Sequence, residues 1–381
     1  MKSLPVTILS GFAGAGKTIV IQHVLKNLPE LKIGVIANDW TGDDLLSAVT
    51  KLAGAGRFDY LLIELSGNSE PMPVAEAFSP IRQDGDAACD AAGIDTMVTV
   101  VDAVNFLNDF QSVEELRERG IGVDDADNRD VSRVLIEQIE FANVILLNKT
   151  DLVSEEECAF LRALLSKLNP NARVLAIEHG QVPVEEVVNT GRFQLEWAAE
   201  VDAWQSMLAG NTTDQADAYG ISSFVYRARR PFHPQRFWDF WMAGEHTPNI
   251  LRSKGYFWLA TRNSMSGFWS HVGQVLAAEP GGAWWAETSR TEWPTDDPEL
   301  LAELDSVWDE VWGDRRQELM LIVQDVDAAA IKDALNACLL TDSEMQSGPM
   351  SWGRLEDPFG SWDAEHVCDG SHDHDHDHDH G

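Results

Sequence analysis

The sequence predicts an α/β protein with a mostly parallel, doubly wound sheet, followed by a smaller α+β domain and a disordered His/Asp tail. Three observations support this prediction. Short apolar runs alternate with helical patterns over about the first 180 residues, tryptophans gather in the second half, and residues 372–380 alternate His and Asp. Alternating strands and helices are typical of parallel sheets that helices cover on both faces.

Six apolar runs in the first part of the chain show little polar alternation, as expected for strands buried on both faces. They are Val6–Leu9, Ile33–Ala37, Tyr60–Ile63, Met97–Val101, Val144–Leu147 and Arg173–Ala176. The helical patterns between them include Lys17–Leu28, Val131–Phe141 and Glu155–Leu168. We place this first domain at residues 1–190.

The composition changes in the second half. Only Trp40 of the 14 tryptophans precedes residue 197, and we interpret the others as core aromatics rather than a ligand site. We expect a linker at 191–220, the α+β domain at 221–340, and an acidic, His-rich tail without its own core at 341–381. Within the α+β domain, residues 294–310 are acidic and predict a solvated insertion. Its expected strands and helices are Ser222–Arg227, Gly255–Ala260 and Gln317–Val323, and Pro234–Ala243 and Asp327–Cys338.

The charge balance excludes several classes of partner. The chain has 28 Lys and Arg against 63 Asp and Glu, a net charge of −35, which disfavours binding to nucleic acid or to an anionic membrane surface. No apolar run is long enough to predict a transmembrane helix. Four cysteines are too few for a disulfide framework, so we expect a reduced, cytoplasmic setting.

The first expected strand leads into a glycine-rich segment that fits G-x-x-x-x-G-K-[ST], and a helical pattern follows it. The segment consists of Gly11, Phe12, Ala13, Gly14, Ala15, Gly16, Lys17 and Thr18. Glycines let backbone N–H groups approach phosphate oxygens, and the helix N-terminus adds partial positive charge. We expect Lys17 to reach the β- and γ-phosphates and the Thr18 hydroxyl to bind Mg²⁺. The segment therefore predicts the phosphate loop of a P-loop NTPase.

An N-K-x-D pattern follows another expected strand, at Asn148, Lys149 and Asp151. A carboxylate such as Asp151 can accept hydrogen bonds from both N1–H and the exocyclic amine of guanine. Adenine offers no such pair of donors, so a buried acceptor would stay unmatched. We expect Asn148 and Lys149 to hold the loop and cover the base. The pattern predicts GTP; a cap of the following helix, and with it an ATP-dependent protein, is the alternative.

Glu64 and Gly67 stand where many GTPases carry D-x-x-G. In that motif the acid holds Mg²⁺, and the glycine N–H contacts the γ-phosphate. Lys17 and Glu64 are therefore our candidate catalytic residues. Asn38 and Asp39 belong either to a switch loop or to a simple turn after the second strand. No arginine finger or water-positioning Gln is evident, so we expect slow intrinsic hydrolysis.

The end of the chain offers ligands for a transition metal. In an extended chain, residues two apart lie about 6.6 Å apart on one face, so several imidazoles can gather around one ion of Zn²⁺, Ni²⁺, Co²⁺ or Cu²⁺. The alternatives are a solvating acidic tail and a purification tag. The candidate ligands are His366, Cys368, His372, His374, His376, His378 and His380.

With these motifs in order, the chain resembles the CobW family of metal-linked P-loop GTPases. The resemblance covers about residues 4–340. It implies a GTPase domain followed by a smaller CobW C-terminal α+β domain, and a metallochaperone or metal-insertion factor, most often for zinc. The residues that carry it are Gly11–Thr18, Glu64–Pro71, Val101–Ala103, Glu137–Ala142, Asn148–Asp151, Arg252–Gly255, Phe257–Trp258 and Gly313–Arg316.

One departure concerns metal binding. The family usually carries a C-x-C-C motif between the phosphate loop and the Glu-x-x-Gly strand, and this chain has no Cys between Lys17 and Glu64. The departure puts an internal metal site in doubt, along with metal-triggered GTP turnover.

Two functions remain. The first is a GTPase that converts GTP to GDP and phosphate and couples this to handling or delivery of a metal, zinc first and nickel or cobalt next, to an unidentified client metalloprotein. The second is a metal-buffering or storage protein with a His-rich tail and little turnover. The expected cofactors are GTP, Mg²⁺ and Zn²⁺ (or Ni²⁺ or Co²⁺), and homo-oligomer formation is left open.

Overall fold

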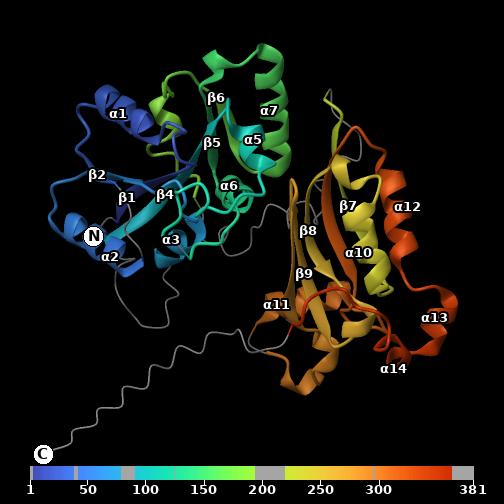
Figure 1. Ribbon diagram of the computed structural model, residues 1–381. Coiled ribbons are helices and arrows are strands. Elements are labelled where there is room, and N and C mark those ends of the chain that lie inside the picture. The colour runs from blue at the N-terminus through green and yellow to red at the C-terminus, as the bar shows by residue number, and fades with distance from the viewer. Residues whose placement is uncertain are drawn as a thin grey trace, which may run out of the picture.

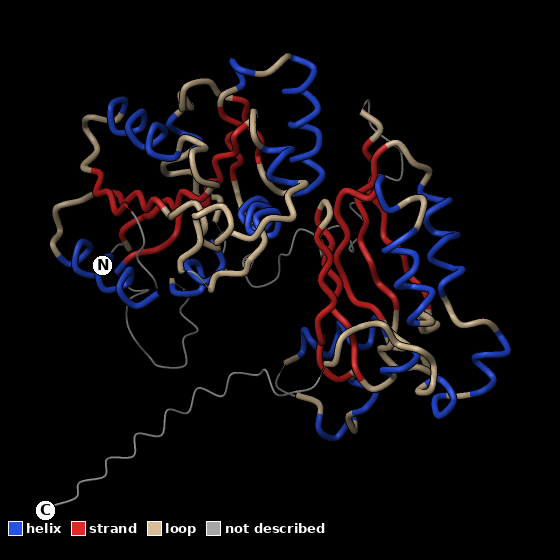
Figure 2. Tube along the Cα trace, viewed as in Figure 1, coloured by secondary structure: helices blue, strands red, loops and turns tan. Residues whose placement is uncertain are grey.

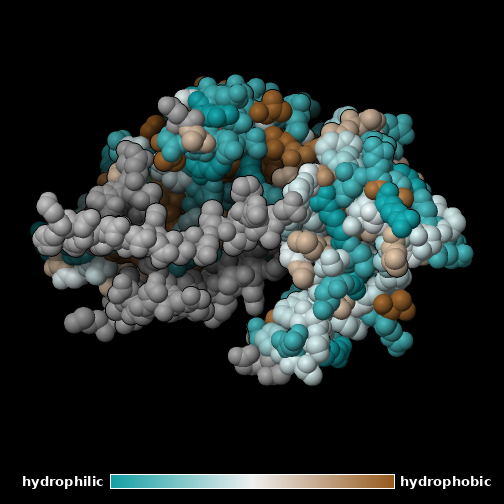
Figure 3. Space-filling model, turned by 60° about the horizontal axis from the view of Figure 1, so that its bottom comes forward, coloured by the Kyte–Doolittle hydropathy of each residue, from teal (hydrophilic) through white to brown (hydrophobic). Residues whose placement is uncertain are grey.

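The computed structural model describes residues 3–37, 42–78, 91–124, 126–193, 219–294 and 297–362. These residues form two domains, each built on one sheet (Figure 1). The two sheets are the two groups of red strands in Figure 2. Within the described ranges, no helix is both long and apolar enough to cross a membrane. The face shown in Figure 3 is largely hydrophilic over the described residues, in keeping with the net charge of −35.

The first domain contains six parallel strands in the order β2-β3-β1-β4-β5-β6. The six expected strands are confirmed, although β4 begins earlier than predicted. Strand β1 lies between β3 and β4. The strands β3 and β2 extend the sheet on one side of β1, and β4, β5 and β6 extend it on the other, so the strand order reverses at β1. Such a switch point opens a crevice at the carboxyl edge of a parallel sheet, where ligands bind. The strands are β1 (Leu4–Ser10), β2 (Ile33–Ala37), β3 (Tyr60–Glu64), β4 (Ala92–Asp102), β5 (Val144–Asn148) and β6 (Arg173–Ala176).

Helices cover both faces of this sheet. In β3, Tyr60 and Leu62 join the core beneath α1, while Leu61 and Ile63 join the core beneath α2 and α3. This alternation explains the absence of a polar pattern in the strands. The helices are α1 (Lys17–Asn27) on one face, and α2 (Gly42–Gly54), α3 (Pro71–Ala77), α5 (Phe106–Phe110), α6 (Val131–Glu140) and α7 (Glu155–Leu168) on the other.

The second domain is an antiparallel sheet in the order β10-β9-β8-β11-β7, with helices on one face. The α+β prediction is confirmed. The strands are β7 (Ile221–Ala228), β8 (Ile250–Phe257), β9 (Met265–Val272), β10 (Val275–Ala283) and β11 (Gln317–Gln324). The helices are α10 (Pro234–Ala243), α11 (Pro298–Val307), α12 (Ala328–Cys338), α13 (Asp342–Ser347) and α14 (Pro349–Trp352).

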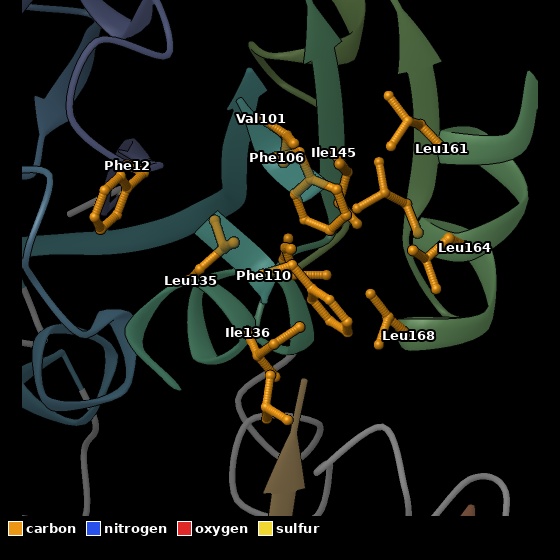
Figure 4. Close-up of a cluster of buried hydrophobic side chains, with 14 of the residues drawn as sticks. Phe12, Val101, Phe106, Phe110, Leu135, Ile136, Ile145, Leu161, Leu164 and Leu168 are labelled. Atoms are coloured by element: carbon orange, nitrogen blue, oxygen red, sulfur yellow. The ribbon is translucent and has the colours of Figure 1, made fainter. Parts of the chain in front are cut away.

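Strand β11 shows how the second sheet serves two cores. Leu319 and Leu321 point into the aromatic core with α10 and α12, whereas Met320 and Ile322 join a cluster that includes α5, α6 and α7 of the first domain. Figure 4 shows the first-domain part of this cluster, with Phe106 and Phe110 of α5 beside Ile136 of α6 and the leucines of α7. The two domains therefore share buried apolar contacts.

The structure corrects two expectations for the second half and adds a helix to a third. The strand expected at Gly255–Ala260 overlaps β8 only at its first three residues, because β8 runs from Ile250 to Phe257. The charged residues Arg252 and Lys254 concealed its start, although both are buried. The expected insertion at 294–310 contains α11, capped at its start by the Asp297 carboxylate. Residues 341–362, expected as the start of the tail, include α13 and α14, and Trp352 and Phe359 among them are buried.

The packing of this last segment rests on large aromatic side chains. Trp352 is buried, its ring centroid lies 5.9 Å from that of Trp312, and its indole N–H donates to the Glu344 carbonyl at 2.7 Å. Phe359 is buried in the core with α10. The segment is short of apolar residues, but each one that it buries is large, so composition alone does not reveal it.

We predict that Trp352→Ala lowers the free energy of unfolding of the second domain by about 3–5 kcal/mol, because it leaves a cavity among large rings. Denaturant unfolding followed by tryptophan fluorescence measures this loss. Met350→Ala in the same helix is the matched control, since Met350 is 87% exposed and its loss changes little. Equal unfolding midpoints for the two variants would contradict the packing role of Trp352.

Candidate functional site

The glycine-rich loop joins the end of β1 to the start of α1. Gly16, the residue before the helix, has φ 109°, in the region that favours glycine, and a Cβ there would lie 2.4 Å from Nδ2 of Asn148. Helix α1 has no side-chain cap and no acidic residue in its first turn. Its first N–H groups and the positive end of its dipole are thus free of a competing carboxylate, which suits a phosphate.

Lys17, the first residue of α1, folds back over this loop. The Lys17 ammonium donates to the carbonyl oxygens of Gly11 at 2.5 Å and of Phe12 at 3.3 Å. Burial lowers the pKa of Lys17 to about 8, against the opposing effect of the Glu64 carboxylate. A cation is therefore held at the mouth of the loop by carbonyl oxygens, where an anionic ligand would compensate its loss of water.

Thr18 and Glu64 meet beside the loop. The Thr18 hydroxyl donates to a Glu64 carboxylate oxygen at 2.7 Å, and Glu64 ends β3 directly opposite Leu9 of β1. A hydroxyl and a carboxylate are hard oxygen ligands of the kind that Mg²⁺ takes. This pair therefore fits the ion as expected from the sequence. Asn38 and Asp39, the other candidates in this region, lie outside the described residues.

The segment Ser66–Glu70, here called the Gly67 loop, lies against the phosphate loop. A Cβ on Gly67 would lie 2.5 Å from the backbone nitrogen of Ala13, so no other residue fits there without a shift. The Gln138 side chain of α6 donates to the carbonyl oxygens of Gly67 at 3.1 Å and of Ser69 at 2.9 Å. The glycine expected to sense the γ-phosphate is thus brought to the phosphate loop and held there by α6.

Asn148, at the end of β5, ties two loops together. Its amide N–H donates to the Ala15 carbonyl at 2.9 Å, and its amide oxygen accepts from the Gly180 N–H at 3.0 Å. The side chain is 1% exposed. Asn148 therefore holds the phosphate loop to the segment that follows β6.

Lys149 has φ 62°, a left-handed backbone conformation that residues other than glycine rarely adopt. The Lys149 ammonium lies 2.6 Å from a carboxylate oxygen of Asp102, at the end of β4. Burial acts to raise the pKa of Asp102, but hydrogen bonds from Lys149, Asn105 and the Val104 N–H outweigh it and lower that pKa. Asp102 thus stays ionised and fixes Lys149.

Asp151 lies in the same loop, with its side chain 23% exposed. One of its carboxylate oxygens lies 3.7 Å from Nε2 of His179, a residue of the segment after β6. The structure therefore brings all three N-K-x-D residues to the carboxyl edge of the sheet, next to the phosphate loop.

Sequence reasoning missed part of this site. It gave no role to residues 177–180, which contact Asn148, Thr150 and Asp151. Their only signal is their place after the last strand, at the edge where ligands of parallel sheets bind. It also gave no role to Gln138, although this residue lies in the segment Glu137–Ala142 that carries the family resemblance.

The proposed transition-metal ligands of the tail, His366 to His380 with Cys368, lie outside the described residues. Within the described ranges, no group of three or more His, Cys, Asp or Glu is placed to hold a metal ion. Cys158 and Cys338 are free thiols there. Burial raises the pKa of Cys338 to about 12, so this thiol stays protonated in the core of the second domain.

Comparisons with known proteins match both domains of the chain. Residues 5–42 and 40–176 match the CobW/HypB/UreG nucleotide-binding domain, and residues 221–339 match the cobalamin synthesis protein CobW C-terminal domain. Zinc-regulated GTPase metalloprotein activator 1 of Dictyostelium discoideum is 38% identical, covering 94% of this chain and 84% of that protein. A zinc chaperone of Mycobacterium tuberculosis is 29% identical, covering 84% of this chain and 76% of that protein.

Among solved structures, the Zn(II)-bound YjiA GTPase from E. coli is 20% identical, with a TM-score of 0.38, and covers 89% of this chain and 100% of that one. The two domain matches and the relative from Dictyostelium extend over both sheets described above. The chain therefore belongs to the CobW family, with a CobW/HypB/UreG nucleotide-binding domain followed by a CobW C-terminal domain.

Proposed function

We propose that this protein hydrolyses GTP to GDP and phosphate and couples the reaction to the delivery of a transition metal, zinc first, to a client protein in the cytoplasm. The observation that carries the GTPase part is the bond from Asn148 to Ala15, which joins the N-K-x-D loop to the phosphate loop. A base site and a phosphate site at this fixed spacing suit one nucleoside triphosphate. The metal part rests on the relatives, which are named as zinc-regulated and zinc-chaperone proteins.

Each residue has a part in this proposal. The N–H groups at the start of α1 and the Lys17 ammonium hold the β- and γ-phosphates. The Thr18 hydroxyl and the Glu64 carboxylate hold Mg²⁺, which neutralises charge on the phosphate oxygens when it is bound. Asp151 accepts the two guanine donors, with Lys149 and His179 beside it. Gly67 contacts the γ-phosphate through its N–H.

The intrinsic rate in this proposal is slow. The Gly67 loop contains no Gln that could position a water, and the residue after Gly67 is Asn68. Its amide N–H donates to the Ile121 carbonyl at 2.6 Å, and its amide oxygen accepts from the Ser66 hydroxyl at 2.6 Å. The Asn68 side chain is thus used to shape the Gly67 loop. A client or a metal ion is needed to complete the site.

We predict that Asp151→Asn weakens GTP binding by about 10- to 100-fold, because one guanine donor loses a charged acceptor. The same variant should gain affinity for xanthosine triphosphate, whose C2 carbonyl accepts a hydrogen bond where guanine donates one. Displacement of a fluorescent GTP analogue by GTP, ATP and xanthosine triphosphate measures both effects. Asp305→Asn, at an exposed carboxylate of α11, is the control. Equal displacement by ATP and GTP in the wild type would refute guanine recognition.

We predict that Lys17→Ala lowers the single-turnover rate of GTP hydrolysis by about 10²- to 10³-fold, because it removes a preorganised charge from the phosphates. Lys26→Ala, at an exposed position of the same helix, should keep the wild-type rate. The assay is run with and without Zn²⁺. Wild-type protein that binds GTP but shows no measurable turnover in either condition would favour the metal-buffering function instead.

We predict that deleting residues 366–381 removes most bound Zn²⁺ or Ni²⁺ and leaves Mg²⁺·GTP binding intact. The cut spares Trp362, whose ring stacks on the Arg262 guanidinium at 4.0 Å and packs on Phe257. Elemental analysis with and without a non-hydrolysable GTP analogue gives the stoichiometry. Replacing the five His of 372–380 by Asn is the control that keeps the chain length. A tight, nucleotide-sensitive metal site in the truncated protein would contradict the tail assignment.

A further inference from the structure

Helix α6 contacts the candidate nucleotide site and the second domain within three residues. Gln138 is fully buried, and its amide N–H groups hold the Gly67 and Ser69 carbonyls. Two residues later, Glu140 accepts from the Arg252 guanidinium of β8 at 2.8 Å. Glu140 and Arg252 are 112 positions apart in the chain, and both side chains are at most 10% exposed. One short helix therefore bonds to both partners.

A second pair fastens the same loop to the start of α6. Glu70, at the end of the Gly67 loop, lies 2.8 Å from Arg129, which Asp127 also binds at 2.8 Å. Arg129 directly precedes Asp130, the residue before the first turn of α6. The Gly67 loop is thus attached to α6 through Gln138 and to the residues just before α6 through Arg129. A shift of the loop is therefore passed to the helix.

At the other end of this connection, α6 and the second sheet enclose a polar seam. It surrounds a cavity of about 70 Å³, large enough for water. Three cations and three carboxylates line it and balance in charge: Arg133, Arg252, Lys254, Glu137, Glu140 and Glu279. Beside the buried pair, Lys254 lies 3.6 Å from Glu140, and the half-exposed Arg133 lies 3.1 Å from Glu279.

This seam differs from the apolar contact formed by Met320 and Ile322. Apolar packing tolerates many small displacements, whereas buried charges must keep their partners or lose a large share of their stabilisation. A joint of this kind favours discrete arrangements over continuous ones. The Gln138 amide oxygen is also buried without a hydrogen-bond partner among the described residues. A loop position that supplied a donor to it would therefore be favoured.

We propose that α6 transmits the nucleotide state to the second domain, with Gln138 as the positioning residue of the Gly67 loop and Glu140 as the attachment of the second domain. The inference rests on the proposed function, since it requires that Gly67 contacts the γ-phosphate. Occupation of the γ-phosphate position moves the loop, α6 follows, and the ion pairs of the seam rearrange. The sheet of the second domain thereby becomes the output of the GTPase site.

The first test concerns affinity. Gln138→Met keeps the side-chain volume and deletes both hydrogen bonds to the loop. It should weaken binding of the non-hydrolysable analogue GMPPNP relative to GDP by about fivefold or more, because only the triphosphate uses the loop. Gln317→Met is the matched control, since Gln317 is an equally buried amide that holds the Arg230 and Trp258 carbonyls far from the site. It should keep the wild-type ratio.

The second test concerns the second domain of the full-length protein. Amide hydrogen exchange of peptides from β8 and β9 should differ about twofold or more between the GDP and GMPPNP complexes. Gln138→Met and Glu140→Gln should lose this difference, although both still bind GDP. Where Glu140→Gln does not fold, Arg133→Gln serves in its place. It breaks only the half-exposed pairs and should at least halve the difference.

The outcomes separate the inference from the proposed function. Wild-type protein that binds both nucleotides with identical exchange in β8 and β9 would overturn the coupling and leave the GTPase assignment standing. Retention of the wild-type affinity ratio in Gln138→Met would overturn the role of Gln138. Failure of the wild type to bind either nucleotide would instead overturn the proposed function itself.

Discussion

The candidate site depends on one buried side chain, the amide of Asn148. It gives its N–H to the phosphate loop at Ala15 and takes the N–H of Gly180 from the segment after β6. The amide of an asparagine is neutral and can donate and accept at the same time from fixed positions. Gly16 has no Cβ, and a Cβ at this position would collide with the Asn148 amide. The phosphate loop can therefore close onto this amide. The spacing between the phosphate and base ends of the site follows from this contact.

Much of the first domain could be predicted from the sequence because its physics is local. Apolar runs indicated β1 to β6, and the phosphate loop needs its own residue types at fixed spacing. The second domain was harder to predict because its strands depend on distant partners. Arg252 and Lys254 are buried in β8, and both lie beside Glu140 of α6, which is 112 positions from Arg252. Periodicity within a window of residues cannot detect such a pair.

The candidate site shows the same division between local and distant information. The residues of the two sequence motifs, Lys17 to Thr18 and Asn148 to Asp151, lie together as the patterns indicated, and their roles stay predictions. Gln138 and His179 were missed because their contacts are to backbone carbonyls and to a carboxylate far away in sequence. Their chemistry becomes visible only once the loops are placed side by side. The structure thus supplied the connections among the loops, whereas the sequence supplied the chemical groups.

The stacking of Trp362 on Arg262 has a consequence for the residues that follow it. It fixes the point from which the histidines extend, on the second domain rather than on the phosphate loop. His372 lies ten positions further on and His380 eighteen, so an extended chain carries them at most about 35 Å and about 63 Å from that point. Any ion that they bind thereby stays within about 63 Å of this point on the second domain. A protein docked on the sheet of that domain would meet the ion at the local concentration of a tethered ligand, independently of the concentration in solution.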